Sequence, residues 1–273
     1  MAGADPGRWA GVRRALAGHR YRGWHGHDGL LMDILARHAR IALQFSGGRD
    51  SLACLYLLRQ HLDRMTVYWL NTGDAFPEML EIIEHARELA PRFVEIRSDR
   101  AGIIDQYGMP TDLLPRSSTP IGLATGQSTV RMQDSYSCCA RVVMEPMHRR
   151  MIEDGITLII RGQRADDGHK APIVSGTIEQ GIQYYFPIEE WTAEDVTEYL
   201  DSAGAPYLRF YDQLDTAPDC MHCSGWWSEG RAAYLRRYHP HAYQRYREAL
   251  GIICTETAAH IAHFNHEYTE TPL

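Results

Sequence analysis

The sequence predicts an α/β protein with a doubly wound, mostly parallel sheet and a helical C-terminal extension. Two observations support this prediction. From residue 40 onward, short apolar runs alternate with amphipathic segments, and from residue 228 onward the chain is rich in arginine and tyrosine with helical character. Alternation of this kind implies crossover connections and a sheet that helices cover on both faces. With 273 residues, 44% of them hydrophobic, the chain can bury one core of good size.

The predicted strands are short apolar runs of the kind that a parallel sheet buries. They lie at residues 41–45 (IALQF), 65–70 (MTVYWL), 92–96 (RFVEI) and 156–162 (ITLIIRG). The helices expected between and after them have apolar residues at helical spacing. They lie at residues 50–61, 77–90 and 142–154, in WTAEDVTEYL, and from 228 through Leu250 and again from about 255.

Two local signals refine this assignment. Thr192 is expected to cap the helix in WTAEDVTEYL, with Asp195 at the capping-box position. Residues 108–137 are rich in Pro, Gly, Ser and Thr without a clear period, so we expect a long lid or binding loop there. The predicted organisation is therefore an N-terminal helical segment (1–39), an α/β domain (40–227) and the helical extension (228–273).

Composition narrows the classes of function. The formal net charge of −7 disfavours a surface that grips nucleic acid non-specifically, although a local basic strip could still do so. No apolar run has the length of a membrane span, and the N-terminal residues lack a signal-peptide core. We therefore expect a cytoplasmic protein with no membrane partner. Only one of the 28 cationic residues is a lysine, Lys170.

The stretch SGGRDS (46–51) joins a predicted strand to a predicted helix. Helix N-termini favour anions, glycines let the main chain approach a phosphate closely, and the Ser46 and Ser51 hydroxyls can donate hydrogen bonds. The stretch is shorter than the GxxxxGK[ST] loop and has no lysine. It resembles the PP-loop of the ATP pyrophosphatase superfamily. That resemblance implies an adenine nucleotide α-hydrolase-like fold in which Ser46, Gly47, Gly48, Arg49, Asp50 and Ser51 bind ATP phosphates.

Two further segments resemble the phosphoadenosine phosphosulfate (PAPS) reductase family within that superfamily. NTGDAFPEM (71–79) is similar to the family's DTGxxFPE segment and implies that Asp74 organises nucleotide or metal. RGQRADDGHKAP (161–172) is similar to its GxRxxxS-type loop and implies nucleotide binding at Gly162. Its cations suit phosphate or sulfate oxygens and are candidates to hold the α-phosphate or substrate: Arg161, Arg164 and Lys170. A solvated turn is the simpler alternative for this segment.

Six cysteines in a chain without export signals indicate metal ligands or redox thiols more than disulfides. Cys54 lies on an apolar helical face and is expected in the core. The other pattern is CC at 138–139 followed by CxxC at 220–223, and four thiolates can hold a [4Fe–4S] cluster or a zinc ion. The pattern resembles that of assimilatory adenylyl-sulfate (APS) reductases, which implies a cluster on Cys138, Cys139, Cys220 and Cys223. His222 is interpreted as local polarity and not as a ligand.

The chain also departs from the reductases. Val143 stands where their CCxxRKxxPL segment usually has lysine, and no ECGLH-like motif with a nucleophilic cysteine occurs. Cys254 lies in the corresponding region and is a candidate nucleophile, but its context favours a packed thiol. The phosphate loop is complete, whereas the reductases typically have a degraded one. A complete loop is needed when ATP itself is split.

We therefore expect an enzyme that splits ATP to AMP and pyrophosphate, with Mg²⁺ and a [4Fe–4S] cluster, to activate a substrate for sulfur transfer. The resemblance brings forward DNA phosphorothioation and tRNA thiolation, with a nucleic-acid substrate and a sulfur donor such as a cysteine desulfurase. One alternative is an APS or PAPS reductase that uses thioredoxin and Cys254. Another is a non-catalytic nucleotide- or nucleic-acid-binding subunit with structural zinc. A homodimer is also among the expected assemblies.

Overall fold

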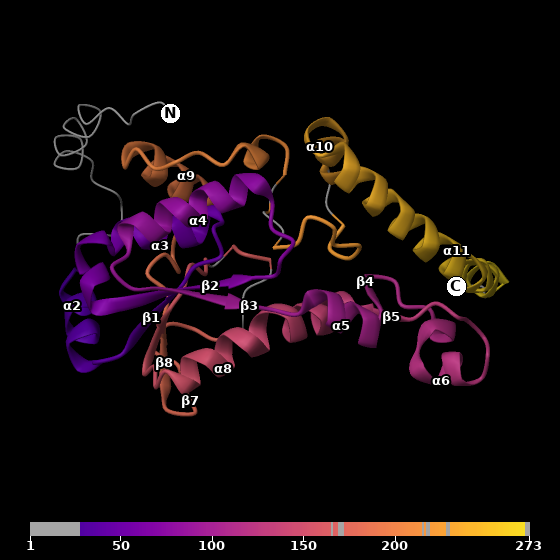
Figure 1. Cartoon of the computed structure of the whole chain (residues 1–273), viewed down its shortest axis with the longest axis horizontal. Helices are drawn as coiled ribbons and strands as arrows, with labels where there is room; N and C mark the ends of the chain where they lie inside the picture. The colour runs from indigo at the N-terminus through magenta and orange to yellow at the C-terminus, as the bar shows by residue number, and fades with distance from the viewer. Residues whose placement is uncertain are drawn as a thin grey trace. The chain divides into compact units, whose positions relative to one another are not determined.

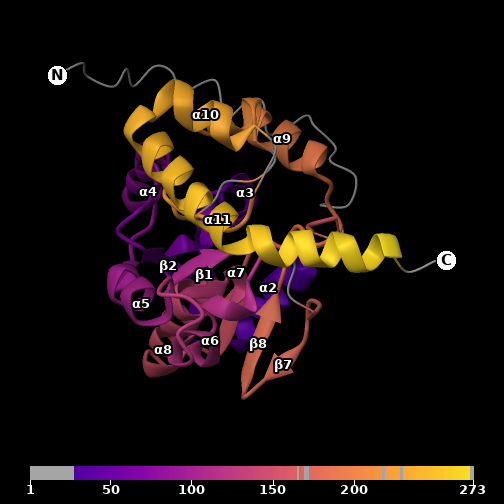
Figure 2. The ribbon, with the colours of Figure 1, turned by 90° about the vertical axis from the view of Figure 1, so that its right-hand side faces the viewer.

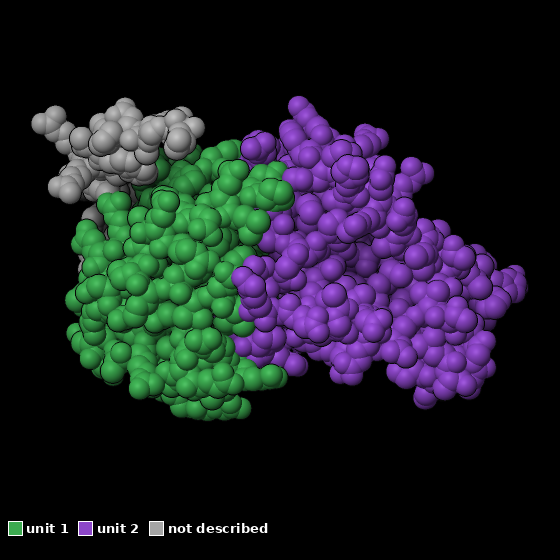
Figure 3. Space-filling view, viewed as in Figure 1, with its two compact units in different colours: residues 1–70, 77–96, 149–208 green, residues 71–76, 97–148, 209–273 purple. Residues whose placement is uncertain are grey.

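The computed structural model describes residues 28–270, apart from residues 165, 169–171, 215, 217–218 and 228–229 (Figure 1). The chain forms two compact units, which Figure 3 colours separately. Unit 1 comprises residues up to Leu70, Pro77–Ile96 and Arg149–Leu208. Unit 2 comprises Asn71–Phe76, Arg97–His148 and the residues from Arg209 onward. This division differs from the expected boundaries, because the C-terminal helices cluster with the segments that carry Cys138, Cys139, Cys220 and Cys223.

A six-stranded sheet in the order β3-β2-β1-β6-β8-β7 forms the centre of the fold. Strand β1 pairs in parallel with β2 and β6, β6 pairs in parallel with β8, and only β7 is antiparallel to its neighbour among the pairings of β1, β6, β7 and β8. The strands are β1 (Ile41–Gln44), β2 (Met65–Asn71), β3 (Phe93–Arg97), β6 (Leu158–Ile160), β7 (Ile178–Glu179) and β8 (Ile182–Tyr185). The mostly parallel α/β sheet is therefore confirmed, and β7 and β8 are additions that the sequence pattern did not predict.

The central strands are apolar throughout because both faces of the sheet are covered. In β1, Ile41, Ala42 and Leu43 are each at most 1% exposed, and all of β6 is fully buried. Ile41 lies opposite Met65 on one side and Leu158 on the other. Continuous burial of this kind explains why these runs lack the alternation of a half-exposed strand.

Helices pack on both faces of the sheet. Figures 1 and 2 show α3 and α4 on one face and α8 on the other. Met151 of α8 is fully buried, and the Gln44 amide of β1 contacts its sulfur at 3.9 Å. Helix α9 has the predicted capping box, with the Thr192 hydroxyl accepting from the Asp195 N–H. The helices are α2 (Asp28–Arg37), α3 (Arg49–Leu57), α4 (Pro77–Leu89), α8 (Glu145–Glu153) and α9 (Ala193–Ser202), with a 3-10 segment at Arg59–Arg64.

Unit 2 contains a two-stranded parallel ladder and several short helices in the stretch where a long loop was expected. The ladder pairs β4 (Met109–Thr111) with β5 (Met132–Asp134). The helical segments around it are α5 (Arg100–Tyr107), the 3-10 turn Arg116–Ser118, α6 (Pro120–Ala124), α7 (Ser135–Cys139) and a π-helical turn (Ala140–Met144) that leads into α8. Residues 108–137 are therefore an ordered platform within unit 2 and not an open loop.

The C-terminal part of unit 2 is helical, as predicted, but the break falls at another place. A 3-10 turn (Arg209–Asp212) precedes α10 (Arg231–Tyr238) and α11 (Pro240–Glu270). Proline fits the first turn of a helix and cannot continue the preceding one, which explains why α11 begins at Pro240 and then runs unbroken past residue 255. Neither α11 nor any other helix in the described part of the chain is long and apolar enough to cross a membrane.

Candidate functional site

The phosphate loop lies at the carboxyl end of β1. Residues 46–48 connect β1 to α3, whose N-cap is Gly48 and whose N-terminus has no side-chain cap. The loop is held by short local bonds: the Gly48 N–H donates to Ser46 Oγ at 3.3 Å, and Ser51 Oγ donates to the Gly48 carbonyl at 2.9 Å. Ser46 is exposed and Ser51 is buried. The helix N-terminus and the two hydroxyls form a cradle that suits a phosphate.

Two glycines are required by the packing of this cradle. Gly47 has φ +84°, and a Cβ at this position would lie 2.2 Å from the sulfur of Met79 on α4. Gly162 follows β6, and its Cβ would lie 2.5 Å from the backbone of Asp50. Because β1 and β6 are parallel neighbours, their carboxyl ends bring the 46–51 and 161–164 stretches together. The structure therefore brings together Gly162 and the phosphate loop, as expected for one nucleotide site.

Asp50 and Arg164 form an ion pair at this edge of the sheet. Arg164 Nε donates to Asp50 Oδ1 at 2.8 Å, and the same guanidinium also donates to Asp166. Burial raises the pKa of Asp50, and the charges of Arg164 and Arg49 only partly oppose this effect. Although burial lowers the pKa of Arg164, the Asp50 and Asp166 carboxylates raise it overall. Arg164 therefore links the two loops, and its charge is already compensated by carboxylates.

Two other cations were predicted as ligands in residues 161–172, namely Arg161 and Lys170. Arg161 is partly buried, and its guanidinium carbon lies 5.8 Å from the centre of the Phe186 ring. Burial lowers the pKa of Arg161. Lys170 lies outside the described residues, so its predicted role as a phosphate or substrate ligand remains a prediction.

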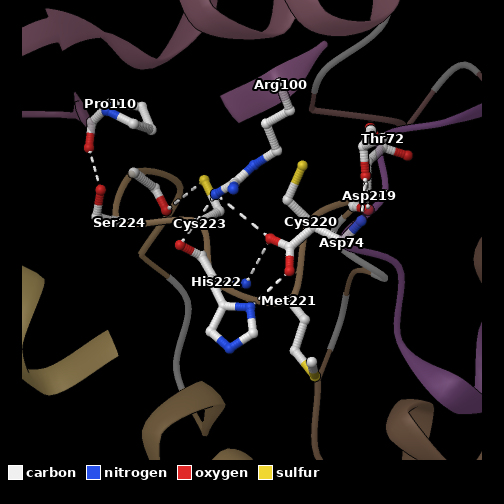
Figure 4. A network of polar contacts seen from close by, with 12 residues as sticks. Thr72, Asp74, Arg100, Pro110, Asp219, Cys220, Met221, His222, Cys223 and Ser224 are labelled. Carbon is white, nitrogen blue, oxygen red and sulfur yellow. Dashed lines mark hydrogen bonds and ion pairs between the residues drawn. The ribbon is translucent and has the colours of Figure 1, made fainter. Parts of the chain in front are cut away.

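The predicted cysteine ligands all lie in unit 2. Cys138 and Cys139 end α7, and Cys220 and Cys223 lie on the loop before α10. The CxxC loop is held from both sides: the Met221 N–H donates to the Asp74 carbonyl at 2.7 Å, and Ser224 Oγ donates to the Pro110 carbonyl at 2.6 Å (Figure 4). The 71–76 segment and the β4 ladder thereby position the CxxC loop.

The four thiols gather around Cys223, which interacts electrostatically with each of the other three. Burial raises the pKa of Cys138 to about 11 and those of Cys139 and Cys220 to about 12, and it also raises that of Cys223. Burial thus favours the neutral thiol form over the thiolate at all four positions. Binding to a metal requires thiolates, so loading this site would release protons.

The donor set can be compared with the two kinds of metal site. Among the described residues, no three Cys, His, Asp or Glu side chains form a group that could hold one metal ion. A tetrahedral zinc needs its ligands crowded around a single ion, whereas a [4Fe–4S] cluster places each cysteine sulfur on a different iron. The four thiols have the donor chemistry that a [4Fe–4S] cluster requires, and the cluster stays a prediction.

Asp74 lies with the CxxC loop in unit 2. Its carboxylate accepts from His222 Nδ1 at 2.5 Å and from the His222 N–H at 3.0 Å, and Arg100 Nη2 lies 3.3 Å from it (Figure 4). His222 is therefore a polar partner, in agreement with its interpretation as a non-ligand. A pocket of about 580 Å³ borders this network, and Arg245 also lines it. Met221 and His222 of the CxxC loop line this pocket.

Three side chains near the thiols were missed by the sequence analysis. Trp226 has φ +53°, which is unusual for a bulky residue, and its Nε1 donates to Cys139 Sγ at 3.0 Å. Arg100 and Arg231 both lower the pKa of Cys223 against the larger effect of burial. The adjacent tryptophans after CxxC could have indicated the first contact. Arg100 and Arg231 could not be singled out from the sequence, because the chain has many arginines.

Two other cysteine predictions have different outcomes. Cys54 is fully buried in the core, as predicted. The packed-thiol interpretation of Cys254 is wrong, because Cys254 is exposed on α11. Residue 254 falls on the solvent side of that helix, while its neighbour Ile253 is buried. Because an exposed thiol is accessible to a substrate, the exposure of Cys254 is compatible with a role as nucleophile, and that role remains a prediction.

A mostly parallel α/β sheet with this loop at the carboxyl end of β1 is the architecture of the PP-loop class. The chain belongs to the phosphoadenosine phosphosulfate reductase domain family, whose model matches residues 40–226. Membership of this enzyme family confirms the family resemblance and argues against the non-catalytic alternative, while the cysteine pattern stays a prediction.

Relatives and a solved structure agree with this assignment. The chain is 24% identical over 220 residues to an adenosine 5'-phosphosulfate reductase of Burkholderia cepacia, covering 75% of this chain and 82% of the relative. It is 28% identical over 193 residues to a phosphoadenosine 5'-phosphosulfate reductase of Xanthomonas campestris, covering 69% and 73%. The phosphate complex of a PAPS reductase from Candida auris has a TM-score of 0.51 at 13% identity, covering 80% of this chain and 97% of that one, and shows the fold alone.

Proposed function

We propose that this enzyme binds ATP at residues 46–51 and splits it to AMP and pyrophosphate, to activate an acceptor for sulfur transfer. The observation that carries the proposal is the complete phosphate loop, in which Gly47 at φ +84° packs against Met79 and no side chain caps α3. A pyrophosphate cradle of this completeness has a use when the β- and γ-phosphates are present. A substrate that is already adenylated does not need it.

The chain's own residues would act by binding and charge stabilisation. A nucleophilic atom of the acceptor attacks the α-phosphorus, and the bond from that phosphorus to the bridging oxygen breaks. Pyrophosphate takes the electron pair and leaves. The α3 N-terminus and the Ser46 and Ser51 hydroxyls stabilise the negative charge that develops on it.

Magnesium would enter with the nucleotide. The two carboxylates predicted to act on the nucleotide already have cationic partners, Asp50 in unit 1 with Arg164 and Asp74 in unit 2 with Arg100 and His222. Mg²⁺ usually keeps several waters and binds substrate phosphates together with one or two carboxylates. Arg161 is partly buried and follows β6 directly. It would hold the α-phosphate or the incoming substrate.

The second cofactor of the proposal is a [4Fe–4S] cluster on Cys138, Cys139, Cys220 and Cys223. When bound, a cluster with a cysteine on every iron would supply charge and redox chemistry at this site. The protein residues around it hold the ligand segments together, chiefly through Asp74 and Trp226. The acceptors that the family resemblance brings forward are those of DNA phosphorothioation and tRNA thiolation, with a cysteine desulfurase as the class of sulfur donor.

A second candidate function is sulfonucleotide reduction, which the curated relatives favour more than they favour ATP splitting. The exposed Cys254 thiol is the observation on this chain that supports it. As a thiolate it would attack the sulfur of APS or PAPS and displace the nucleotide phosphate. Thioredoxin would then supply two electrons to release sulfite and restore the thiol. The chain lacks an ECGLH-like motif around Cys254.

One anaerobic preparation can separate the two functions. The protein is incubated with Mg²⁺-ATP and either total tRNA or DNA, and pyrophosphate is measured. In parallel it is incubated with APS or PAPS, thioredoxin and a reductant, and sulfite is measured. We expect pyrophosphate with one of the nucleic acids and no sulfite. Sulfite release that Cys254→Ser abolishes would establish the reductase instead.

A further inference from the structure

Arg231 is a buried cation at the first position of α10, the helix that follows the CxxC loop in the sequence. Its exposure is 0%, although arginine is rarely buried without a partner. Gly230 precedes it at φ +80°, and a Cβ there would lie 2.4 Å from the Gln213 carbonyl oxygen. The turn that starts α10 therefore places the guanidinium inside unit 2.

The guanidinium is only half satisfied. Nη2 donates to the carbonyls of Cys220 at 3.1 Å and Met221 at 3.3 Å, and the guanidinium carbon lies 5.1 Å from the centre of the Tyr246 ring. Nε and Nη1 are buried and have no hydrogen-bond partner among the described residues. No described carboxylate forms an ion pair with Arg231.

This arrangement is costly unless an anion is bound nearby. A buried charge without a partner is strongly disfavoured, and unpaired buried donors add to the cost. Other cations near the thiols have partners: Arg100 pairs with Asp74, and Arg141 Nη1 donates to Gln133 at 2.7 Å. Among these three, Arg231 is the one that is fully buried and has guanidinium nitrogens without a hydrogen-bond partner in the described residues, and it interacts with Cys223.

We propose that Arg231 is the buried counter-charge of an anionic four-thiolate cofactor held by Cys138, Cys139, Cys220 and Cys223. This inference rests on the cluster in the proposed function, because four thiolates outweigh the charge of the iron–sulfur core. Arg231 acts through its charge and through the two carbonyls of the CxxC loop. It is a positioning residue and does not ligate iron.

The test compares three variants of the full chain, each purified anaerobically in apo and reconstituted forms. Arg231→Met removes the charge while retaining much of the apolar stem, and Arg231→Lys retains the charge. Arg236→Met removes a charge from the exposed side of the same helix and is the matched control. The measurements are the melting temperature of the apo form, iron per chain, and the rate of iron loss to a chelator.

We expect Arg231→Met to leave the apo melting temperature unchanged or raise it, because it removes an uncompensated buried charge. In the reconstituted form it should lose iron roughly 10- to 100-fold faster than wild type, the usual effect of removing an outer-shell partner. The cluster's reduction potential should fall, because a nearby cation favours the reduced, more negative state. Arg231→Lys should lie between, and Arg236→Met should match wild type.

Each other outcome overturns a defined claim. If Arg231→Met and Arg231→Lys both lower the apo melting temperature, Arg231 has a structural role and the inference fails. It also fails if wild type and Arg231→Met hold iron equally well at the same potential, or if Arg236→Met has the same effect. If wild type takes up no iron–sulfur cluster at all, the cofactor of the proposed function is wrong.

Discussion

The phosphate loop of unit 1 and the cysteine site of unit 2 are built in different ways. The loop is a single stretch of six residues, and the hydrogen bonds that join Ser46, Gly48 and Ser51 are local. The cysteine site is assembled from distant segments, and several anchors of the CxxC loop and of the tryptophan after it join residues far apart in the chain. Those anchors come from Asp74, Arg100, Pro110 and Cys139. Backbone geometry can preform a site within one short stretch of chain, whereas a site assembled from several segments depends on contacts between those segments.

The largest expected effect is on the cysteine site. Cys223→Ser should reduce the iron content and the absorbance at about 400 nm at least tenfold, because Cys223 interacts with the three other thiols and serine is a poor ligand for iron–sulfur clusters. Anaerobic reconstitution followed by iron and sulfide analysis measures it.

Cys254→Ser is the matched control for that variant, since Cys254 is exposed. It should retain the full iron content. A cluster that survives in Cys223→Ser, or disappears in Cys254→Ser, would show that the four assigned cysteines are not the ligands.

The second effect concerns the preformed loop. Gly47→Ala should lower the free energy of unfolding by about 2–5 kcal/mol, because it adds a left-handed backbone penalty to a clash with Met79. Gly73→Ala provides the comparison, because Gly73 has φ +73° and no atom within 4 Å of the added Cβ. It should cost only about 1–2 kcal/mol. Denaturant unfolding measures both, and equal losses would rule out the packing argument.

The third effect is on the reduction potential of a cluster bound at the cysteine site. Trp226→Phe removes the N–H that donates to Cys139 Sγ, so the reduction potential of the cluster should fall and stability should drop by about 1 kcal/mol. Trp227→Phe is the control, because its Nε1 donates to the Ser224 carbonyl at 2.7 Å and not to sulfur. It should cost similar stability without moving the potential. A shift of equal size in both variants would contradict a specific N–H···S bond.

The smallest effect lies outside both sites, in the capping box of α9. Thr192→Ala should cost about 1 kcal/mol at neutral pH. The backbone N–H and the hydroxyl of Thr192 lower the pKa of Asp195, so this bond stabilises the fold above the unfolded-state pKa of about 4. The stabilisation is lost as the pH falls through the lower folded-state pKa.

The difference in stability between wild type and Thr192→Ala should therefore shrink below about pH 4. Thr197→Ala on the same helix removes only a bond to the Ala193 carbonyl and is the control. Chemical unfolding at several pH values measures this dependence. A difference that stays constant down to acid pH would mean that Asp195 does not take part.

The same contrast explains how much could be predicted from the sequence. The strands at 41–45 and 65–70, the phosphate loop and the α9 cap were predictable because each depends on residues close together in the chain. The short strands β7 and β8 have little periodicity and were missed. The start of α11 at Pro240 could have been predicted from the proline alone.

The surroundings of the thiols could not be predicted in this way. Nothing near Asp74 in the sequence indicates that it binds His222, because the two are 148 residues apart. Arg231 was one arginine in an arginine-rich segment, and only its burial distinguishes it. The four cysteines were identified through a resemblance, whereas their electrostatic environment required the structure.

The central claim is that the loop at residues 46–51 binds the pyrophosphate portion of ATP. Calorimetric titration of the protein with ATP, AMP, APS and PAPS, each with Mg²⁺, tests it most directly because no acceptor is needed. We expect ATP to bind at least roughly tenfold more tightly than AMP, about 1.4 kcal/mol or more, and more tightly than either sulfonucleotide. Equal affinity for ATP and AMP, or tighter binding of APS or PAPS than of ATP, would contradict it.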